Sequence, residues 1–166
     1  MSSSPISWPA VGAVALPLVG GHLSGYLGRE NYGAWYDSLK KPDWKPPRLA
    51  FPIVWTSLYA GMGYASYLVW KEGGGFSGSN QLTLAAYGTQ LALNFAWSPI
   101  FFGQKSIKGG LIDITLLDIA AVGTTILFYK VHPTAGYIML PYLAWLGLAT
   151  ALNLRIYKDN PEVKDK

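Results

Sequence analysis

Charged side chains are scarce in this chain and cysteine is absent. Only 13% of its 166 residues are Asp, Glu, Lys or Arg, against about 25% in soluble domains. Without cysteine the chain can form no disulfide, thiolate zinc site, iron–sulfur cluster or cysteine nucleophile. Its two histidines are too few for a histidine-rich metal site, so we expect no metal and no cofactor.

The common catalytic motifs are also missing. The chain has no glycine-rich phosphate loop, no HExxH sequence and no serine nucleophile elbow. These absences argue against a conventional hydrolase and against an ATP-driven pump.

Long apolar stretches dominate what is present, since 51% of the residues are hydrophobic and 14% are aromatic. Crossing about 30 Å of hydrocarbon takes roughly 20 residues as a helix. Four stretches of that length lack Asp, Glu, Lys and Arg, and a fifth contains only Asp113 and Asp118. We therefore predict an all-α integral membrane protein, a single five-helix bundle with a long structured first loop and a tail at 155–166. The expected spans are about 8–28, 49–70, 82–103, 109–129 and 134–154.

Lysine and arginine gather on one side of these spans. Of 13 basic residues, only Lys71 and Lys130 fall in loops on the other side. Cytoplasmic loops of membrane proteins carry such an excess, so we predict a cytosolic C-terminus. The pI of about 9.2 then reflects topology and does not indicate nucleic-acid binding. The other basic residues lie in the first loop, the third loop and the tail: Arg29, Lys40, Lys41, Lys45, Arg48, Lys105, Lys108, Arg155, Lys158, Lys164 and Lys166.

The first loop, residues 29–48, is longer than most connections, and loops of this length often cover binding sites. Prolines at 42, 46, 47 and 52 restrict its backbone and hold Trp44 in a stiff, extended segment. Two interpretations are open: a rigid connector with aromatics at the membrane surface, or a lid over a binding site.

Three spans carry a tryptophan within a stripe at helical spacing. Each stripe alone fits helix–helix contact, in which buried amides find partners. Together the three favour an aromatic-lined cavity for a large, flat, mostly apolar ligand. The stripes are Trp55, Tyr59 and Met62; Gln90, Asn94 and Trp97; and Trp145, Ala149 and Leu152.

Two aspartates and one histidine lie within the predicted spans. Ionisable groups in hydrocarbon are candidates for function. We expect Asp113, near a span end, to reach Lys105, Lys108 or water. Asp118 lies deeper and needs protonation, a wet cavity or a polar partner such as Thr115. We interpret His22 as packed or pore-lining, because no second metal ligand is near it.

Small residues four apart follow two of the spans. They are Gly21 and Gly25 on the first, and Gly88, Ala92 and Ala96 on the third. Such residues let membrane helices approach closely, and they fit either a homodimer or packing within the bundle.

Four motifs, in this order, resemble the translocator protein family, also called the peripheral-type benzodiazepine receptor or tryptophan-rich sensory protein family. The resemblance runs from about residue 8 to 160, and segments 69–72 and 149–153 are more similar to animal than to bacterial members. The motifs are KPDWKPP at 41–47, WxxxYxxMGxxxY at 55–67, QLALNxxWxPIFFG at 90–103 and PYLAWxxxAxxxN at 141–153.

The resemblance implies a five-helix bundle, often dimeric, in the mitochondrial outer membrane. It implies binding of cholesterol, of porphyrins such as protoporphyrin and haem, and of synthetic drug ligands, with other outer-membrane proteins as further partners. The family's ligand pocket opens toward the cytosol beneath the first loop. The residues that match it here are Gly25, Phe51, Trp55, Asn94, Trp97, Leu116, Trp145, Ala149 and Leu152.

The family's cholesterol motif lies at the end of the last span. By resemblance it implies sterol contacts from Ala149, Leu152, Tyr157 and Lys158. The pattern departs from the family here, because its central tyrosine position is Leu154 and no spacer separates Tyr157 from Lys158. The reverse pattern, Arg155, Tyr157 and Val163, also fits, since such motifs are loose.

These features indicate a receptor or translocator-like membrane protein that binds cholesterol, porphyrins and drug-like ligands, in contact with membrane lipid. One alternative is light- or oxidant-dependent porphyrin breakdown, with Trp55 and Trp145 as redox-active indoles. Another is a structural partner of outer-membrane channels. An enzyme is not the first expectation, because no conventional catalytic constellation is present.

The charge asymmetry leads to a test of topology. In intact mitochondria, the first loop and a C-terminal epitope should be labelled by reagents that cannot cross membranes, because the basic loops face the cytosol. Antibody accessibility before and after rupture of the outer membrane measures this. A tail epitope that is protected until rupture would contradict the orientation.

Overall fold

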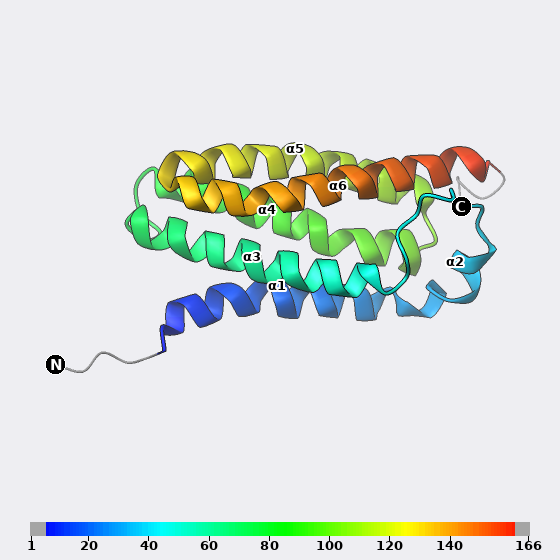
Figure 1. The fold of residues 1–166 in the computed structure, drawn as a ribbon, viewed down its shortest axis with the longest axis horizontal. Helices are drawn as coiled ribbons and strands as arrows, with labels where there is room; N and C mark the ends of the chain where they lie inside the picture. Colours follow the sequence, from blue (N-terminus) through cyan, green and yellow to red (C-terminus); the bar gives the residue numbers. More distant parts are fainter. Residues whose placement is uncertain (1–5, 162–166) are drawn as a thin grey trace.

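Five long helices run side by side along the molecule, and the first loop folds at one end of them (Figure 1). The structure, a computed structural model, describes residues 6–161. A short helix, α2 (Ala34–Ser38), and a 3₁₀ turn (Arg29–Asn31) lie in the first loop, and a π-helical turn (Pro99–Gly103) extends α4. The long helices are α1 (Trp8–Leu27), α3 (Ala50–Glu72), α4 (Asn80–Ser98), α5 (Ile107–Val131) and α6 (Pro133–Asp159).

The all-helical prediction is confirmed, because residues 6–161 contain no strand. Residues 6–161 contain six α-helices, the five long ones and the five-residue α2, so the expected count of five transmembrane helices stays a prediction. Helix α2 forms because the loop buries Tyr36 and Leu39 against aromatic residues of the bundle, which supports a segment too short to be helical alone. At the other end, α6 continues to Asp159, so part of the expected tail is helical. Lys164, Lys166 and Val163 lie outside the described residues.

Local sequence signals account for the helix ends. The Ser7 hydroxyl caps α1 by accepting from the Ala10 backbone N–H, and Ser106 caps α5 in the same way at Gly109. Only His132 separates α5 from α6, which begins on Pro133. Proline suits the first helical position because its missing N–H would have no partner there. The two helices therefore reverse direction sharply and pack side by side.

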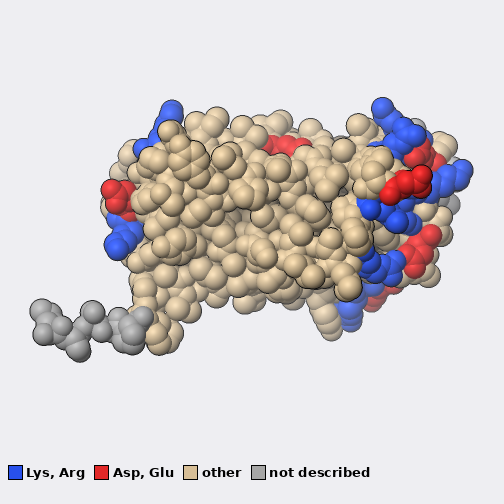
Figure 2. Space-filling model, in the orientation of Figure 1, with Lys and Arg blue, Asp and Glu red and all other residues tan. Residues whose placement is uncertain are grey.

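The surface is suited to a membrane. On the face shown in Figure 2, charged residues gather at the two ends of the bundle, and the band between them is almost uncharged. Three helices, α1, α5 and α6, are long and apolar enough to cross a bilayer. Large apolar side chains such as Val19 and Ile119 point outward, with 65% and 68% of their surface exposed.

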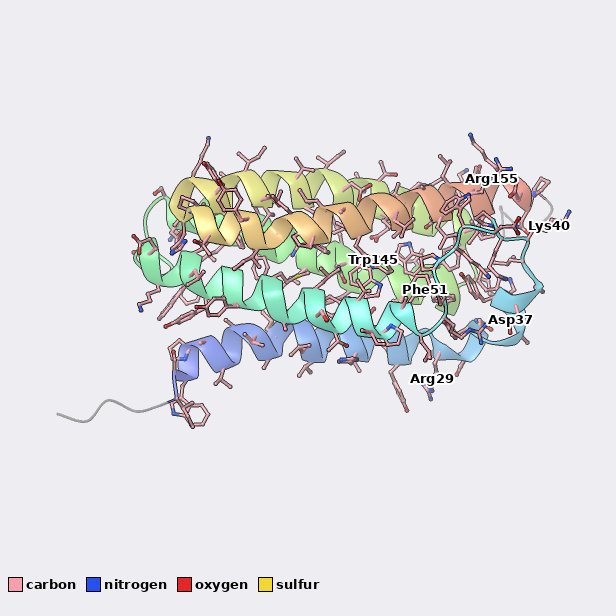
Figure 3. All side chains as sticks on the ribbon, in the orientation of Figure 1. Arg29, Asp37, Lys40, Phe51, Trp145 and Arg155 are labelled. Atoms are coloured by element: carbon pink, nitrogen blue, oxygen red, sulfur yellow. The ribbon has the colours of Figure 1, made fainter. Side chains whose placement is uncertain are left out.

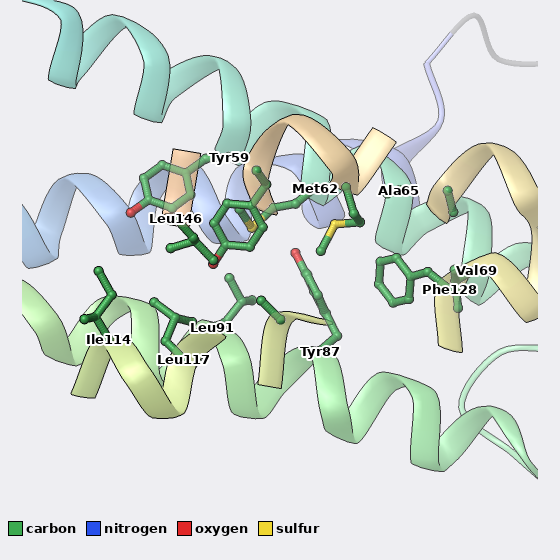
Figure 4. Close-up of a cluster of buried hydrophobic side chains, with 14 residues drawn as sticks. Tyr59, Met62, Ala65, Val69, Tyr87, Leu91, Ile114, Leu117, Phe128 and Leu146 are labelled. Carbon is green, nitrogen blue, oxygen red and sulfur yellow. The ribbon is translucent and has the colours of Figure 1, made fainter. Parts of the chain in front are cut away.

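Inside the bundle, α3, α4, α5 and α6 share an apolar core (Figure 4). Met62 and Val69 from α3 meet Leu117 and Phe128 from α5, and all four are at most 2% exposed. Truncating such a side chain to alanine would leave a cavity, which typically lowers the free energy of unfolding by about 2–5 kcal/mol.

A chain of hydrogen bonds crosses this core. The Tyr59 hydroxyl donates to Asn94 Oδ1 at 2.7 Å, and Asn94 Nδ2 donates to the Tyr142 hydroxyl at 2.9 Å. The Tyr142 hydroxyl then donates to Gln90 Oε1 at 2.6 Å, and Gln90 Nε2 contacts the Met62 sulfur at 3.8 Å. These bonds join α3, α4 and α6 and provide the partners that buried amides need in hydrocarbon.

Helix α1 packs closely against α3 because Gly63 has no side chain. A Cβ atom at Gly63 would lie 2.5 Å from the Ala13 carbonyl oxygen and 2.7 Å from Val14 Cα. Backbone atoms cannot move aside as a flexible side chain can. Gly63 therefore sets the distance between the two helices.

Gly63→Ala should lower the thermal stability of the protein in detergent. The overpacking should cost about 1–3 kcal/mol, which is a decrease of several degrees in melting temperature for a chain of this size. Gly147→Ala is the control, because a Cβ atom there meets nothing within 4 Å. That variant isolates the intrinsic gain of Ala over Gly in a helix. Equal melting temperatures for the two variants would contradict the close α1–α3 contact.

Candidate ligand cavity

A cavity of about 580 Å³ lies beneath the first loop, at the end of the bundle where α3 begins and α6 ends. Its volume falls within the range of small-molecule sites. All five long helices contribute to its walls. The lining residues are Gly21, Ser24 and Gly25 from α1; Phe51, Trp55 and Tyr59 from α3; Asn94 and Trp97 from α4; Ile114 and Leu117 from α5; and Leu146, Ala149, Leu152, Asn153 and Ile156 from α6.

Seven of the nine residues expected at the family's pocket lie together on this cavity. Within the described chain they are Gly25, Phe51, Trp55, Asn94, Trp97, Ala149 and Leu152. Two residues of each tryptophan stripe therefore face this cavity, whereas Met62, Gln90 and Trp145 do not line it. Contact of these residues with a ligand stays a prediction.

The other two expected residues lie outside the lining. Leu116 is 50% exposed on the outer face of α5, whereas its neighbour Leu117 points inward. Consecutive helical residues differ by about 100° in direction, so a shift of one position moves a side chain from cavity to lipid. Trp145 packs edge-on against Phe51 and Trp55, with ring centroids 5.6 and 6.3 Å apart, and supports the wall from behind (Figure 3).

The aromatic wall on α4 is held in place by hydrogen bonds and stacking. Trp97 Nε1 donates to Asn153 Oδ1 at 2.9 Å, and Asn153 Nδ2 donates to the Ile107 carbonyl at 3.2 Å. The Trp97 ring stacks on Phe101 with centroids 4.6 Å apart. Phe101 lies in the π-helical turn, which is closed by the Gln104 N–H donating to the Pro99 carbonyl. Contacts within the protein therefore hold the shape of this wall.

The first loop covers one end of the cavity and is fastened to α6 by Asn160. Asn160 Oδ1 accepts from the Lys40 backbone N–H at 2.9 Å, and Asn160 Nδ2 donates to the Lys40 carbonyl at 3.0 Å. The same Nδ2 donates to the Ile156 carbonyl at 2.7 Å, and the side chain is almost fully buried. At the other side of the loop, Asn31 Nδ2 donates to the Phe102 carbonyl at 2.7 Å. The loop is thus tied to two helices, as a lid would be.

Tyr36 is the main apolar contact of the loop. Its ring lies against Phe102 and stacks on Tyr32, and burial raises the pKa of Tyr36 to about 12. The Lys41 ammonium donates to the Tyr36 and Leu39 carbonyls and lies 4.6 Å from the Tyr36 ring centroid. Partial burial lowers the pKa of Lys41. Trp44, in contrast, points outward with 50% of its surface exposed.

The residues expected at a sterol motif separate in space. Ala149 and Leu152 line the cavity, while Tyr157 and Lys158 lie beyond it. Tyr157 is half-buried beside the aromatic cluster under the loop, and Lys158 is exposed. Contact of a sterol with Tyr157 or Lys158 therefore stays a prediction, at a place outside the lining of this cavity.

Neither carboxylate of α5 contacts the residues named for it from the sequence, although Asp118 does have a polar partner. Asp118 Oδ2 accepts from the Thr150 hydroxyl of α6 at 2.7 Å, not from Thr115, which donates to its own helix at Leu111. Asp113 is buried, and the ion pairs of residues 6–161 do not include it, so its expected contact with Lys105 or Lys108 is not formed. His22 is exposed but contributes to the cavity lining.

The small residues of α1 act within the bundle. A Cβ atom at Gly21 would lie 2.2 Å from the Tyr59 ring, so this glycine admits the ring into the core. At Gly25 a Cβ atom would meet nothing within 4 Å, and the space belongs to the cavity. On α4, Gly88 and Ala92 face outward, so an intermolecular role for them stays a prediction.

Several residues of the site carried no usable sequence signal. Asn160 lies after the last span and bonds to a residue 120 positions away. Tyr32 and Tyr36 have helical spacing, but nothing in the loop sequence indicated which side would face the bundle. The Pro99–Gly103 turn matched a family motif but was expected to continue a regular helix.

The fold and cavity define a helical membrane protein with an aromatic-lined internal cavity under a structured loop. Residues 13–158 match the TspO/MBR family, and the chain belongs to that family.

The chain is 45% identical over 152 residues to Translocator protein of Bos taurus, covering 92% of this chain and 90% of that protein. It is 39% identical over 135 residues to Protein CrtK of Rhodobacter capsulatus, covering 80% and 82%, respectively. With Tryptophan-rich protein TspO of Archaeoglobus fulgidus it shares 37% over 147 residues, covering 89% and 94%. The resemblance seen in the four motifs is confirmed.

The Asn160 bonds lead to a prediction about the lid. Asn160→Ala removes both hydrogen bonds between Asn160 and Lys40. At about 1 kcal/mol each, their loss should raise the equilibrium constant for opening of the loop roughly thirtyfold. Amide hydrogen exchange in residues 31–48 should accelerate by about that factor, while exchange in α5 stays unchanged. Lys158→Ala, at an exposed neighbour, is the control. Unchanged loop exchange in Asn160→Ala would show that Asn160 does not hold the lid.

Proposed function

We propose that this protein is a membrane receptor or translocator-like protein that binds one large, flat, mostly apolar ligand in the cavity under the first loop. The observation that carries the proposal is the convergence of Phe51, Trp55, Trp97 and Tyr59 on a cavity of about 580 Å³. Porphyrins, cholesterol and drug-like ring compounds are the ligand classes we propose, because flat apolar rings gain most from aromatic walls.

The amides in the interior of the cavity agree with a ligand whose buried part has few hydrogen-bonding groups. Asn94 and Asn153 line it, but both amides already bond to protein partners, Asn94 to Tyr59 and Tyr142, and Asn153 to Trp97. A ligand with many polar groups would find few partners there and would lose its bonds to water.

For the membrane arrangement we propose five spans, α1 and α3 to α6, with the first loop and the end of α6 in the cytosol. The bundle length and the uncharged band support all five, although α3 and α4 are less apolar because they bring tyrosines, tryptophans and amides into the core. Residence in the mitochondrial outer membrane is proposed from similarity to animal proteins named Translocator protein. A homodimer and outer-membrane protein partners remain proposals of the same kind.

Porphyrin breakdown is the second candidate function. Trp55 lines the cavity, and the Trp145 indole lies behind it at a centroid distance of 6.3 Å. Of these two indoles, only that of Trp55 would therefore touch a ring bound in the cavity. Trp145 could act only through Trp55 or as support for the wall.

Ala149→Thr tests the cavity as the ligand site. The added branched side chain narrows the wall beside Leu152, and overpacking of about 1–3 kcal/mol corresponds to a five- to two-hundredfold loss of affinity. The measurement is quenching of protoporphyrin fluorescence on titration of protein in lipid nanodiscs, in the dark to exclude photochemistry. Ala151→Thr places the same side chain on the exposed face of α6 and should bind as the wild type does. Equal affinities for wild type and Ala149→Thr would contradict the assignment.

A further inference from the structure

Formal charge is distributed unevenly over the cavity lining. Among the described lining residues, Arg29 and Arg48 carry positive charge and no aspartate or glutamate is present. The two arginines are the end residues of the first loop, Arg29 shortly after α1 and Arg48 shortly before α3. The cavity is thus aromatic in its interior and cationic at the end that the loop covers.

Arg48 is the better placed of the two to meet a ligand. Its guanidinium lies 5.3 Å from the ring centroid of Tyr32, which also lines the cavity. Arg29, in contrast, donates to the Tyr26 carbonyl and lies 3.6 Å over the Tyr26 ring, on the outer side of α1 (Figure 3).

Arg48 also keeps hydrogen-bonding capacity. Its Nη2 donates to Asp37 Oδ1 in the loop. A guanidinium has five N–H donors in a planar fork that fits a carboxylate. The side chains of Arg48 and Asp37 are 57% and 53% exposed, respectively. Ion pairs as exposed as this one contribute little to stability. A second carboxylate can therefore share or replace Asp37 at small cost.

We propose that Arg48 makes the mouth of the cavity selective for ligands that carry a carboxylate at one edge of an apolar ring system. The carboxylate binds the Arg48 guanidinium, in competition with Asp37, while the ring lies against the aromatic walls. A neutral ligand of the same shape gains only the contact of its ring with the aromatic walls. This inference rests on the proposed function, since it assigns a ligand class to the same cavity.

The test compares protoporphyrin with its dimethyl ester, which has the same ring but no ionisable carboxylate. Dissociation constants are measured in nanodiscs of uncharged lipid for wild type, Arg48→Gln and Asp37→Asn. The ratio of ester to acid dissociation constants is compared between proteins, so that differences in solubility of the two probes cancel. Lys45→Gln is the control, because it removes a cation from the same loop at a residue that does not line the cavity.

In wild type we expect the acid to bind about three- to tenfold more tightly than the ester, the usual size of a charge-assisted hydrogen bond at an exposed site. Arg48→Gln should lower the ratio of ester to acid dissociation constants about three- to tenfold relative to wild type, without weakening binding of the ester. Asp37→Asn should raise the ratio, because it removes the competing carboxylate. Lys45→Gln should leave the ratio as in wild type.

The contrary outcomes separate the two proposals. If neither probe binds the wild type, the proposed function itself fails. If both bind but the ratio is the same in wild type and Arg48→Gln, the cavity is occupied and Arg48 selects nothing. A ratio that falls as much in Lys45→Gln as in Arg48→Gln would show general attraction by the basic loop, and would also overturn the inference.

Discussion

The chain of hydrogen bonds through Tyr59, Asn94, Tyr142 and Gln90 is the constraint on which the rest of the bundle depends. In hydrocarbon no water can satisfy an amide, so each of these groups must meet its partner from another helix. The bonds are directional, and all four side chains are nearly fully buried. They therefore fix the rotation of α3, α4 and α6 relative to one another, which apolar contacts alone would leave less defined.

The same network forms the inner end of the ligand cavity. Tyr59 and Asn94 both line it, so the residues that close the core also form the floor of the site. Glycines of α1 allow this arrangement. Gly21 leaves room for the Tyr59 ring, and Gly25, one turn later, leaves space that a ligand can fill. A bundle with larger residues at these positions would have to move α1 away from α3.

The opposite end of the cavity is built differently. The first loop has little regular structure and depends on tertiary contacts: the two bonds between Asn160 and Lys40, the bond from Asn31, and the packing of Tyr36 on Phe102. These contacts are fewer than those of the bundle, so the loop can open without loss of the helices. A rigid floor and a separately fastened cover suit a site whose ligand enters from the loop end.

The sequence alone determined the helical class, the positions of the long helices, the grouping of basic residues at one end and the three tryptophan stripes. These follow from local chemistry: apolar length, the helical period of 3.6 residues and side-chain charge. Only the tertiary structure decided that Leu117 and not Leu116 faces the cavity, that Asp118 bonds Thr150, and that Asn160 fastens the loop. The rotation of a helix by one residue, and bonds between residues 32 to 120 positions apart, depend on how the whole bundle packs. No local pattern encodes that packing.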